Sequence, residues 1–144
     1  MSTVLRRLVT VLGFRINKTG LGDYEKSKIQ LKKIRTHFLN ENPSILIWLD
    51  AVFAQISNAN NVNLYLNELK NLYEKHESGS PAWFIALYYC YIEDYEKTFI
   101  WLENSFNRHE VELTWLREEP LLTPIKEDVR YKDLYTKIGF SKIE

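Results

Sequence analysis

One helical pattern occurs three times along the chain, each time directly after a short polar turn. In every copy, apolar or small residues recur at positions i, i+4 and i+7, the spacing that places side chains on one face of an α-helix. The three copies are Ser27, Leu31 and Ile34; Val62, Leu66 and Leu69; and Thr98, Leu102 and Ser105. Successive copies are offset by 35 and then 36 residues. Three copies in register indicate an internal repeat, and this repeat constrains the fold more than any other feature of the sequence.

The turns that precede these helices share a polar composition. The tetrapeptide DYEK occurs at residues 23–26 and again at residues 94–97, 71 residues apart, and NANN at residues 58–61 lies halfway between them. Asp and Asn are good N-caps because a side-chain oxygen accepts a hydrogen bond from a backbone N–H that the helix leaves unpaired. We therefore interpret all three tetrapeptides as the same turn between two helices, and not as catalytic or recognition motifs.

A helical apolar run also precedes each turn. The three runs cover residues 5–16, 45–56 and 83–92. Pro43-Ser44 opens the second run and Ser80-Pro81 opens the third. Proline is tolerated in the first helical turn, and serine is a common N-cap. The repeating unit is therefore helix, turn, helix, of roughly 35 residues.

This period and layout resemble the tetratricopeptide repeat, which has nominally ~34 residues. The resemblance is carried by GDYEKS at residues 22–27, by EDYEKT at residues 93–98, and by the small–large–small positions after each turn. It implies an all-α, right-handed α-solenoid of about three hairpins, in which each hairpin buries the apolar face of its neighbour.

The C-terminal segment, residues 112–140, resembles a terminal segment of bacterial repeat proteins of this kind. The matching residues are Trp115, Leu116, Pro120, Pro124, Tyr131, Leu134 and Gly139. Tyr131, Leu134, Tyr135 and Ile138 share one helical face, which predicts a capping helix that Gly139 ends. We expect one domain over residues 1–144, with hairpins at about 4–40, 43–77 and 80–110 and a cap at 111–140.

The charge of the chain is zero overall but uneven. Residues 1–37 carry nine Lys or Arg against two acids, and the remainder carries ten against seventeen. The basic residues either form the solvated face of an N-terminal hairpin, or pair with an acidic partner or a second copy of the chain. Because they cluster only in the first third, nucleic acid is not the expected partner.

The sequence also indicates where in the cell the protein is expected. No apolar stretch approaches the ~20 residues that a membrane-spanning helix needs. The single cysteine, Cys90, cannot form an internal disulfide. We expect a cytoplasmic protein with no membrane partner.

No pattern of catalytic or metal-ligating residues stands out. His37, His76 and His109 fall near the ends of second helices in different units, and "HE" at 76–77 and 109–110 lacks the second His of a metalloprotease helix. Cys90 lies in an apolar helix, where a cysteine acts as a small hydrophobe. Acidic pairs such as Glu93-Asp94 fall at turns and helix starts, where they cap. We therefore predict no enzyme activity, no metal and no cofactor.

The resemblance implies a concave groove lined by the first helix of each unit. The groove positions that it implies are Ser44, Ile47, Ala51, Ala54 and Gln55 in the second unit, and Ser80, Trp83, Leu87, Cys90 and Tyr91 in the third. Trp83 and Tyr91 would be rigid anchors of the kind that dominate binding energy. The competing interpretation is that the C-terminal segment folds back and buries them.

Function follows as an expectation of the same resemblance. We expect a non-catalytic interaction or scaffold module that binds a protein or peptide through this groove, with self-association as a variant. The alternative is a sensory or regulatory module of a bacterial transcriptional regulator or signalling protein, as a fragment of a longer chain.

Overall fold

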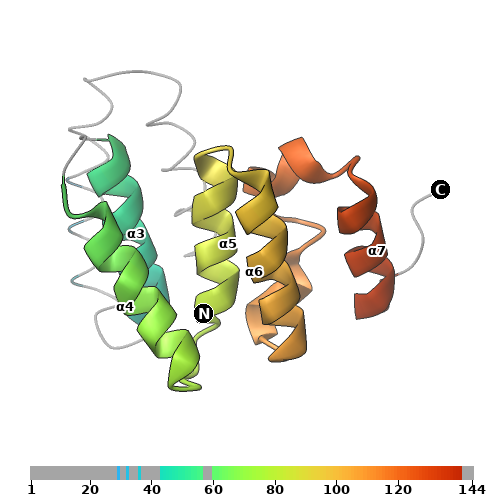
Figure 1. Ribbon diagram of the computed structural model, residues 1–144, viewed down its shortest axis with the longest axis horizontal. Coiled ribbons are helices and arrows are strands. Elements are labelled where there is room, and N and C mark those ends of the chain that lie inside the picture. Colours follow the sequence, from blue (N-terminus) through green and yellow to red (C-terminus); the bar gives the residue numbers. More distant parts are fainter. Residues whose placement is uncertain (1–28, 30–31, 33–35, 37–42, 57–59, 141–144) are drawn as a thin grey trace. The chain divides into compact units, whose positions relative to one another are not determined.

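The computed structural model describes residues 43–56 and 60–140, together with Ile29, Lys32 and Thr36, which are helical (Figure 1). Every regular element in these residues is a helix, which confirms the all-α class. Within the same residues, no helix is long and apolar enough to cross a membrane. The other predictions for the first hairpin, at about 4–40, lie outside the described residues, as does the first DYEK.

The described helices fall within the residue ranges expected for the second and third hairpins and the cap, and the arrangement of these hairpins as a repeat array stays a prediction. The helices are α3 (Pro43–Ile56), α4 (Val62–Glu74), α5 (Pro81–Tyr91), α6 (Tyr95–Asn107), the 3-10 helices η1 (Val111–Trp115) and η2 (Pro120–Ile125), and α7 (Val129–Ile138). The chain divides into two compact units, residues 1–68 and 69–144, and the boundary falls within α4. The prediction of a single domain stays a prediction.

The first unit contains α3 and the beginning of α4. Helix α3 is apolar around most of its circumference, and such a helix is buried in a core. Its buried apolar residues are Ile45, Leu46, Trp48, Leu49, Ala51, Val52, Phe53 and Ala54. At the turn before α4, the backbone N–H of Leu64 donates to the carbonyl of Asn61 at 3.1 Å, so the first turn of α4 begins at Asn61.

The second unit is built around α5. Residues 81–90 of this helix are all buried, and α5 packs against α6 and η2. Helix α6 is amphipathic: Thr98, Leu102 and Ser105 are buried, which confirms the face predicted from the repeat. Helix α6 also packs against η1 and α7. In Figure 1 the orange segment that holds η1 and η2 runs behind α6 before the chain enters α7.

The second DYEK lies where the chain passes from α5 to α6: Asp94 is the N-cap, and the other three residues form the first turn of α6. A carboxylate oxygen of Asp94 accepts the N–H of Lys97 at 3.3 Å and caps α6. Helix α5 ends just before it, where the N–H of Asp94 donates to the carbonyl of Tyr89 at 2.9 Å around Glu93, whose φ is 66°. This is the bond pattern of a Schellman motif, in which glycine usually occupies the left-handed position.

Replacing Glu93 by glycine is expected to raise the free energy of unfolding by up to about 1 kcal/mol, because glycine adopts the left-handed conformation without a clash at Cβ. Urea denaturation measures the change. Glu93→Ala is the matched control, since it removes the same carboxylate but keeps the Cβ. Equal stability of the Gly and Ala variants would mean that the backbone at Glu93 stores no strain.

The capping helix α7 also follows the prediction. The carboxylate of Asp128 accepts the N–H of Arg130 at 2.8 Å, and Gly139, with φ 98°, ends the helix. Tyr131, Leu134 and Tyr135 are buried, so the predicted face is the docked one. The guanidinium of Arg130 lies 4.1 Å from the ring centroid of Phe99 and pairs with Glu96 at 3.0 Å, which ties α7 to α6.

Candidate functional site

The groove positions predicted on α5 are covered by the chain itself. Trp83 is 0% exposed, and Ser80 and Leu87 are also buried. At one end of α5, Ser80 Oγ accepts the N–H of Glu112 at 3.2 Å. At the other end, the thiol of Cys90 donates to the carbonyl of Leu121 at 3.1 Å. Residues 112–121 therefore run along this side of α5, so Ser80, Trp83 and Leu87 do not line an open groove.

The remaining predicted groove positions differ in exposure. Ser44 is buried in α3, Ile47 is half-buried and Gln55 is exposed. Tyr91, at the end of α5, is half-buried, and burial raises the pKa of its hydroxyl. Ile47 and Gln55 belong to one compact unit and Tyr91 to the other. A groove that uses these three residues stays a prediction.

The surroundings of Cys90 indicate a structural role for this residue. Its thiol is buried and donates to a backbone carbonyl. Burial, and then the charge of Glu119, raise the pKa of this thiol to about 12. A nucleophilic cysteine needs a lowered pKa, because the thiolate is the reactive form. The environment of Cys90 therefore keeps it protonated and unreactive at neutral pH.

The loop Arg108–Glu110, which follows α6, clamps the end of α4 to the start of α5. Arg108 Nη1 donates to the carbonyl of Tyr73, at the end of α4, at 2.6 Å. The two carboxylate oxygens of Glu110 accept the N–H groups of Ala82 and Trp83, at the start of α5, at 3.0 and 2.8 Å. One loop thus caps the end of one helix with a cation and the start of the next with a carboxylate, the charges that the helix dipoles favour.

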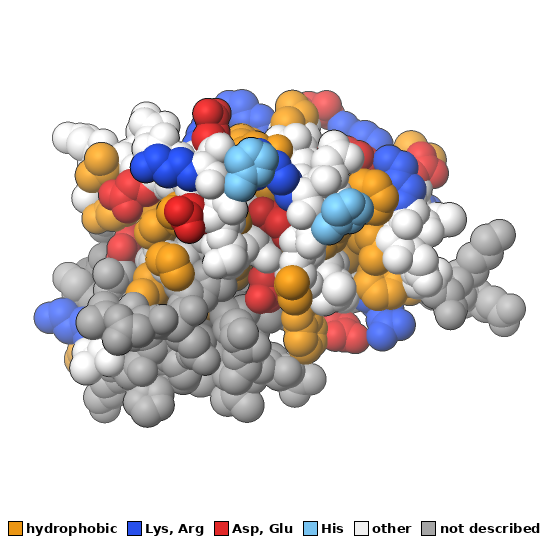
Figure 2. All heavy atoms as spheres, turned by 90° about the horizontal axis from the view of Figure 1, so that it is seen from below, with side chains coloured by type: hydrophobic (Ala, Val, Ile, Leu, Met, Phe, Trp, Pro, Cys, Tyr) orange, Lys and Arg blue, Asp and Glu red, His pale blue; other side chains and the backbone are white. Residues whose placement is uncertain are grey.

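The histidines His76 and His109 stand at matching places in the loops that follow α4 and α6. Both adopt left-handed backbone conformations, with φ 56° and 53°, just after α4 and α6. They line opposite parts of a crevice of about 270 Å³ that also contains Arg108 and Glu110. Figure 2 shows this end of the molecule, where histidines lie among acidic and basic side chains.

No metal centre is assembled at these loops. Among the described residues, no three His, Cys, Asp or Glu side chains are grouped so that they could hold a metal ion. The carboxylate of Glu110 is already engaged by two backbone N–H groups. The crevice is therefore best explained as part of the contacts by which Arg108 and Glu110 join the end of α4 to the start of α5.

A surface of aromatic and cationic side chains extends over α4, α5 and α6; we call it the basic aromatic face. The ring of Tyr73 meets that of Trp101 edge-on at 5.2 Å, and the guanidinium of Arg108 lies 3.9 Å from the centroid of Tyr73. Tyr73, Trp101 and Arg108 are all half-buried, so part of each stays accessible.

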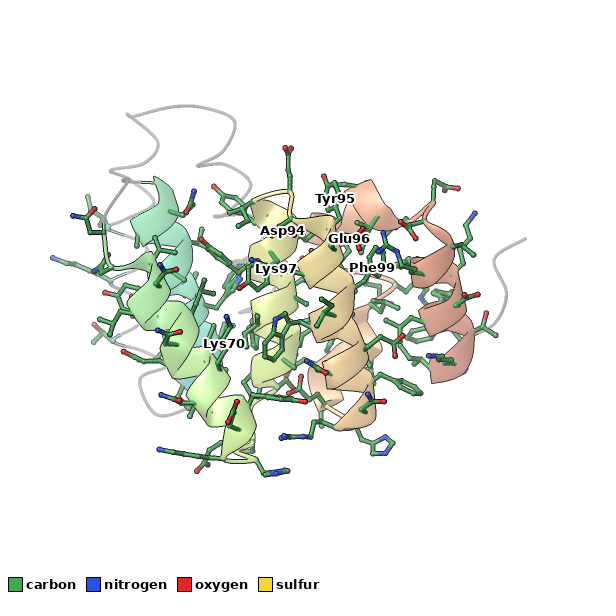
Figure 3. The ribbon with its side chains drawn as sticks, in the orientation of Figure 1. Lys70, Asp94, Tyr95, Glu96, Lys97 and Phe99 are labelled. Atoms are coloured by element: carbon green, nitrogen blue, oxygen red, sulfur yellow. The ribbon has the colours of Figure 1, made fainter. Side chains whose placement is uncertain are left out.

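Tyr89 of α5, which is only 6% exposed, lies beneath two further cations of this face. Lys70 and Lys97 lie 5.8 and 5.3 Å from its ring centroid, and the ammonium of Lys70 donates to its hydroxyl at 3.3 Å. Figure 3 shows Lys70 and Lys97 reaching over α5 from the two neighbouring helices. Lys97 and Trp101 lie on one stripe of α6, Arg108 follows at its C-cap, and Ile100 beside Trp101 is 57% exposed.

A second candidate is a pocket beside α7, which we call the C-terminal pocket. Its volume is about 540 Å³, and it is lined by three cations, Arg117, Lys126 and Lys132. The rings of Tyr131 and Tyr135 form its inner wall. Its volume falls within the range of about 300–1,000 Å³ that small-molecule sites occupy.

The cations of this pocket are held in place. Hydrogen bonds with Glu118 and then Tyr135 raise the pKa of Arg117. The ring centroid of Phe140 lies 5.5 Å from the Arg117 guanidinium. The ammonium of Lys126 donates to the Arg117 backbone carbonyl at 3.2 Å, which fixes the Lys126 side chain against the chain at Arg117.

Comparison with models of protein families, with curated proteins and with solved structures found no match. The two candidate surfaces are therefore interpreted from their own chemistry.

Neither surface was predicted from the sequence. The clamp does have a sequence signal, because Lys75-His76-Glu77 and Arg108-His109-Glu110 repeat a basic–His–Glu triplet 33 residues apart. The basic aromatic face and the C-terminal pocket have no local signal, because each joins side chains from several elements.

Proposed function

We propose that the chain is a non-catalytic binding module built from stacked, tetratricopeptide-like helical hairpins, with a protein or peptide as its partner. Helices α4 and α6 begin 33 residues apart and follow equivalent polar turns. The loops that end them repeat the same basic–His–Glu triplet. The proposal of a repeat array is supported by this correspondence, because repeats stabilise one another through equivalent contacts between neighbours.

The observation that carries the binding proposal is the composition of the basic aromatic face. Tyr, Trp and Arg are the residue types most enriched among the anchors of protein interfaces. Here one of each is in mutual contact: Trp101 with Tyr73, and Tyr73 with Arg108. These contacts hold the three side chains in fixed positions, which lowers the entropy lost when a partner binds.

The charge of this face indicates the chemistry of the partner. Lys70, Lys97 and Arg108 surround the aromatic rings, and the salt bridge of Lys97 with Asp94 is solvent-exposed. We infer a partner segment that presents acidic side chains beside an apolar or aromatic residue. A second copy of this chain is one such partner, because residues 38–144 carry ten basic against seventeen acidic side chains.

Ile100→Glu is expected to weaken partner capture at least about tenfold, because it places a charge among the anchors at a cost of about 1.4 kcal/mol or more. The full chain would be immobilised and exposed to host lysate, and captured proteins would be quantified by mass spectrometry. Sedimentation of wild type and variant measures self-association in parallel.

Val129→Glu is the matched control, because Val129 is 67% exposed, likewise apolar, and lies on α7. The proposal requires a partner that wild type and Val129→Glu retain and Ile100→Glu loses. Equal capture by all three proteins, or loss in both variants, would show that the basic aromatic face is not the binding surface.

A further inference from the structure

The C-terminal pocket has a local charge that differs from its surroundings. Arg117, Lys126 and Lys132 line it together with one acid, Glu127, which pairs with Lys132 at 3.3 Å. The chain after residue 37 is acidic overall. A second acid, Glu118, pairs with Arg117 at 3.1 Å, so the three cations exceed the carboxylates beside them by one positive charge, which favours an anion.

Two of the cations that line the pocket, Arg117 and Lys126, differ in kind. Arg117 offers a planar fork of N–H donors, which suits the paired oxygens of a phosphate or carboxylate. Its carboxylate partner, Glu118, holds it through a solvent-exposed pair at 3.1 Å, and exposed pairs of this kind contribute little and exchange readily. Lys126 has a neutral partner among the described residues, the Arg117 carbonyl, so no carboxylate there neutralises its charge.

The inner wall of the pocket is aromatic. The hydroxyl of Tyr131 donates to the Leu116 carbonyl at 3.1 Å, which fixes the ring, and the ring of Tyr135 lies 4.9 Å from that of Phe140. A bare inorganic anion would contact the cations but leave this wall and most of the 540 Å³ to water. The wall suits an apolar or aromatic body attached to the anionic group.

We propose that the C-terminal pocket binds a small organic phosphate, a phosphate monoester on an apolar or aromatic body. A phosphate monoester carries about −1.5 to −2 charges at pH 7, so it is attracted to a cationic pocket, and it offers three acceptor oxygens. Arg117 and Lys126 bind the phosphate, and Tyr131 and Tyr135 contact the body. The proposal does not depend on the basic aromatic face, and it would give the chain the ligand site of a sensory module.

Titration calorimetry of the full chain with three probes tests the site. The probes are phenyl phosphate, inorganic phosphate and benzoate, which separate the dianion from the aromatic body. Phenyl phosphate is expected to bind about tenfold more tightly than either other probe, because only it satisfies both halves of the pocket. Equal affinity of phenyl phosphate and inorganic phosphate would overturn the inference, since it would show that the aromatic wall takes no part.

Three variants locate the binding. Arg117→Gln is expected to weaken phenyl phosphate at least about tenfold, because it removes the fork of charge-assisted hydrogen bonds. Thr136→Trp fills the pocket with a larger side chain without changing its charge, and is expected to abolish binding. It tests the site independently of any effect that Arg117→Gln has on the fold. Lys97→Gln removes a cation outside the pocket and is expected to change affinity less than about twofold. An effect of Lys97→Gln equal to that of Arg117→Gln would reveal nonspecific attraction and overturn the proposal.

Discussion

Trp83→Ala is expected to lower the free energy of unfolding by about 3–5 kcal/mol, because it removes a fully buried indole from the core and leaves a cavity. Trp83 is 0% exposed and sits on α5, whose residues 81–90 are all buried. A loss of this size approaches the entire stability of many domains, which is about 5–15 kcal/mol. Urea denaturation followed by circular dichroism measures it.

The same substitution separates the two interpretations of Trp83. If Trp83 were an anchor in an open groove, as the sequence suggested, Trp83→Ala would reduce partner binding and leave the unfolding midpoint unchanged. Trp101→Ala is the matched control, since Trp101 is half-buried and its loss is expected to cost clearly less. Trp83→Phe, which keeps an aromatic ring, is expected to lose about 1–3 kcal/mol and to remain folded.

Glu110→Ala is expected to cost about 2–3 kcal/mol, because it leaves the N–H groups of Ala82 and Trp83 without their charged acceptor. Pro81 is the first residue of α5 and has no N–H, so these two are the first donors that the helix must satisfy. Both bonds come from a single side chain 27 and 28 residues away, at 2.8 and 3.0 Å. Thermal and urea unfolding measure the loss.

Glu110→Gln and Ser80→Ala test whether Glu110 or Ser80 caps α5, and Glu127→Ala serves as a control. Glu110→Gln keeps the shape but offers an amide N–H₂ to one of the two donors, and its expected loss is intermediate. Glu127→Ala removes an exposed carboxylate that pairs with Lys132, and is expected to change stability by less than about 1 kcal/mol. A larger loss for Ser80→Ala than for Glu110→Ala would contradict the capping role of Glu110.

Ser80 shows where a local sequence rule gave the wrong partner. Ser before Pro at a helix start predicts that the serine side chain caps the helix. In the structure Ser80 has φ 58° and ψ 52°, outside the extended conformation of an N-cap, and makes no side-chain cap. Its hydroxyl accepts the N–H of Glu112 instead, while Glu110 caps α5. The loop after α6 thus replaces the local cap.

The sequence by itself determined the features that depend on neighbouring residues. The second DYEK marks a turn because Asp94 caps the helix that begins one residue later. The i, i+4, i+7 spacing of Thr98, Leu102 and Ser105 set the buried face of α6, and Gly139 ends α7 because it alone adopts the required backbone conformation cheaply. All of these signals act within about one or two helical turns.

The tertiary structure decided which surfaces are covered and which side chains meet. A helix that is apolar all round, such as α5, carries no periodic signal for which side faces solvent, so only the path of residues 112–121 shows that Trp83 is enclosed. The contact of Tyr73 with Trp101 likewise joins residues that lie far apart in the sequence. Burial and side-chain clusters depend on the arrangement of whole elements, and a local pattern of residues does not encode that arrangement.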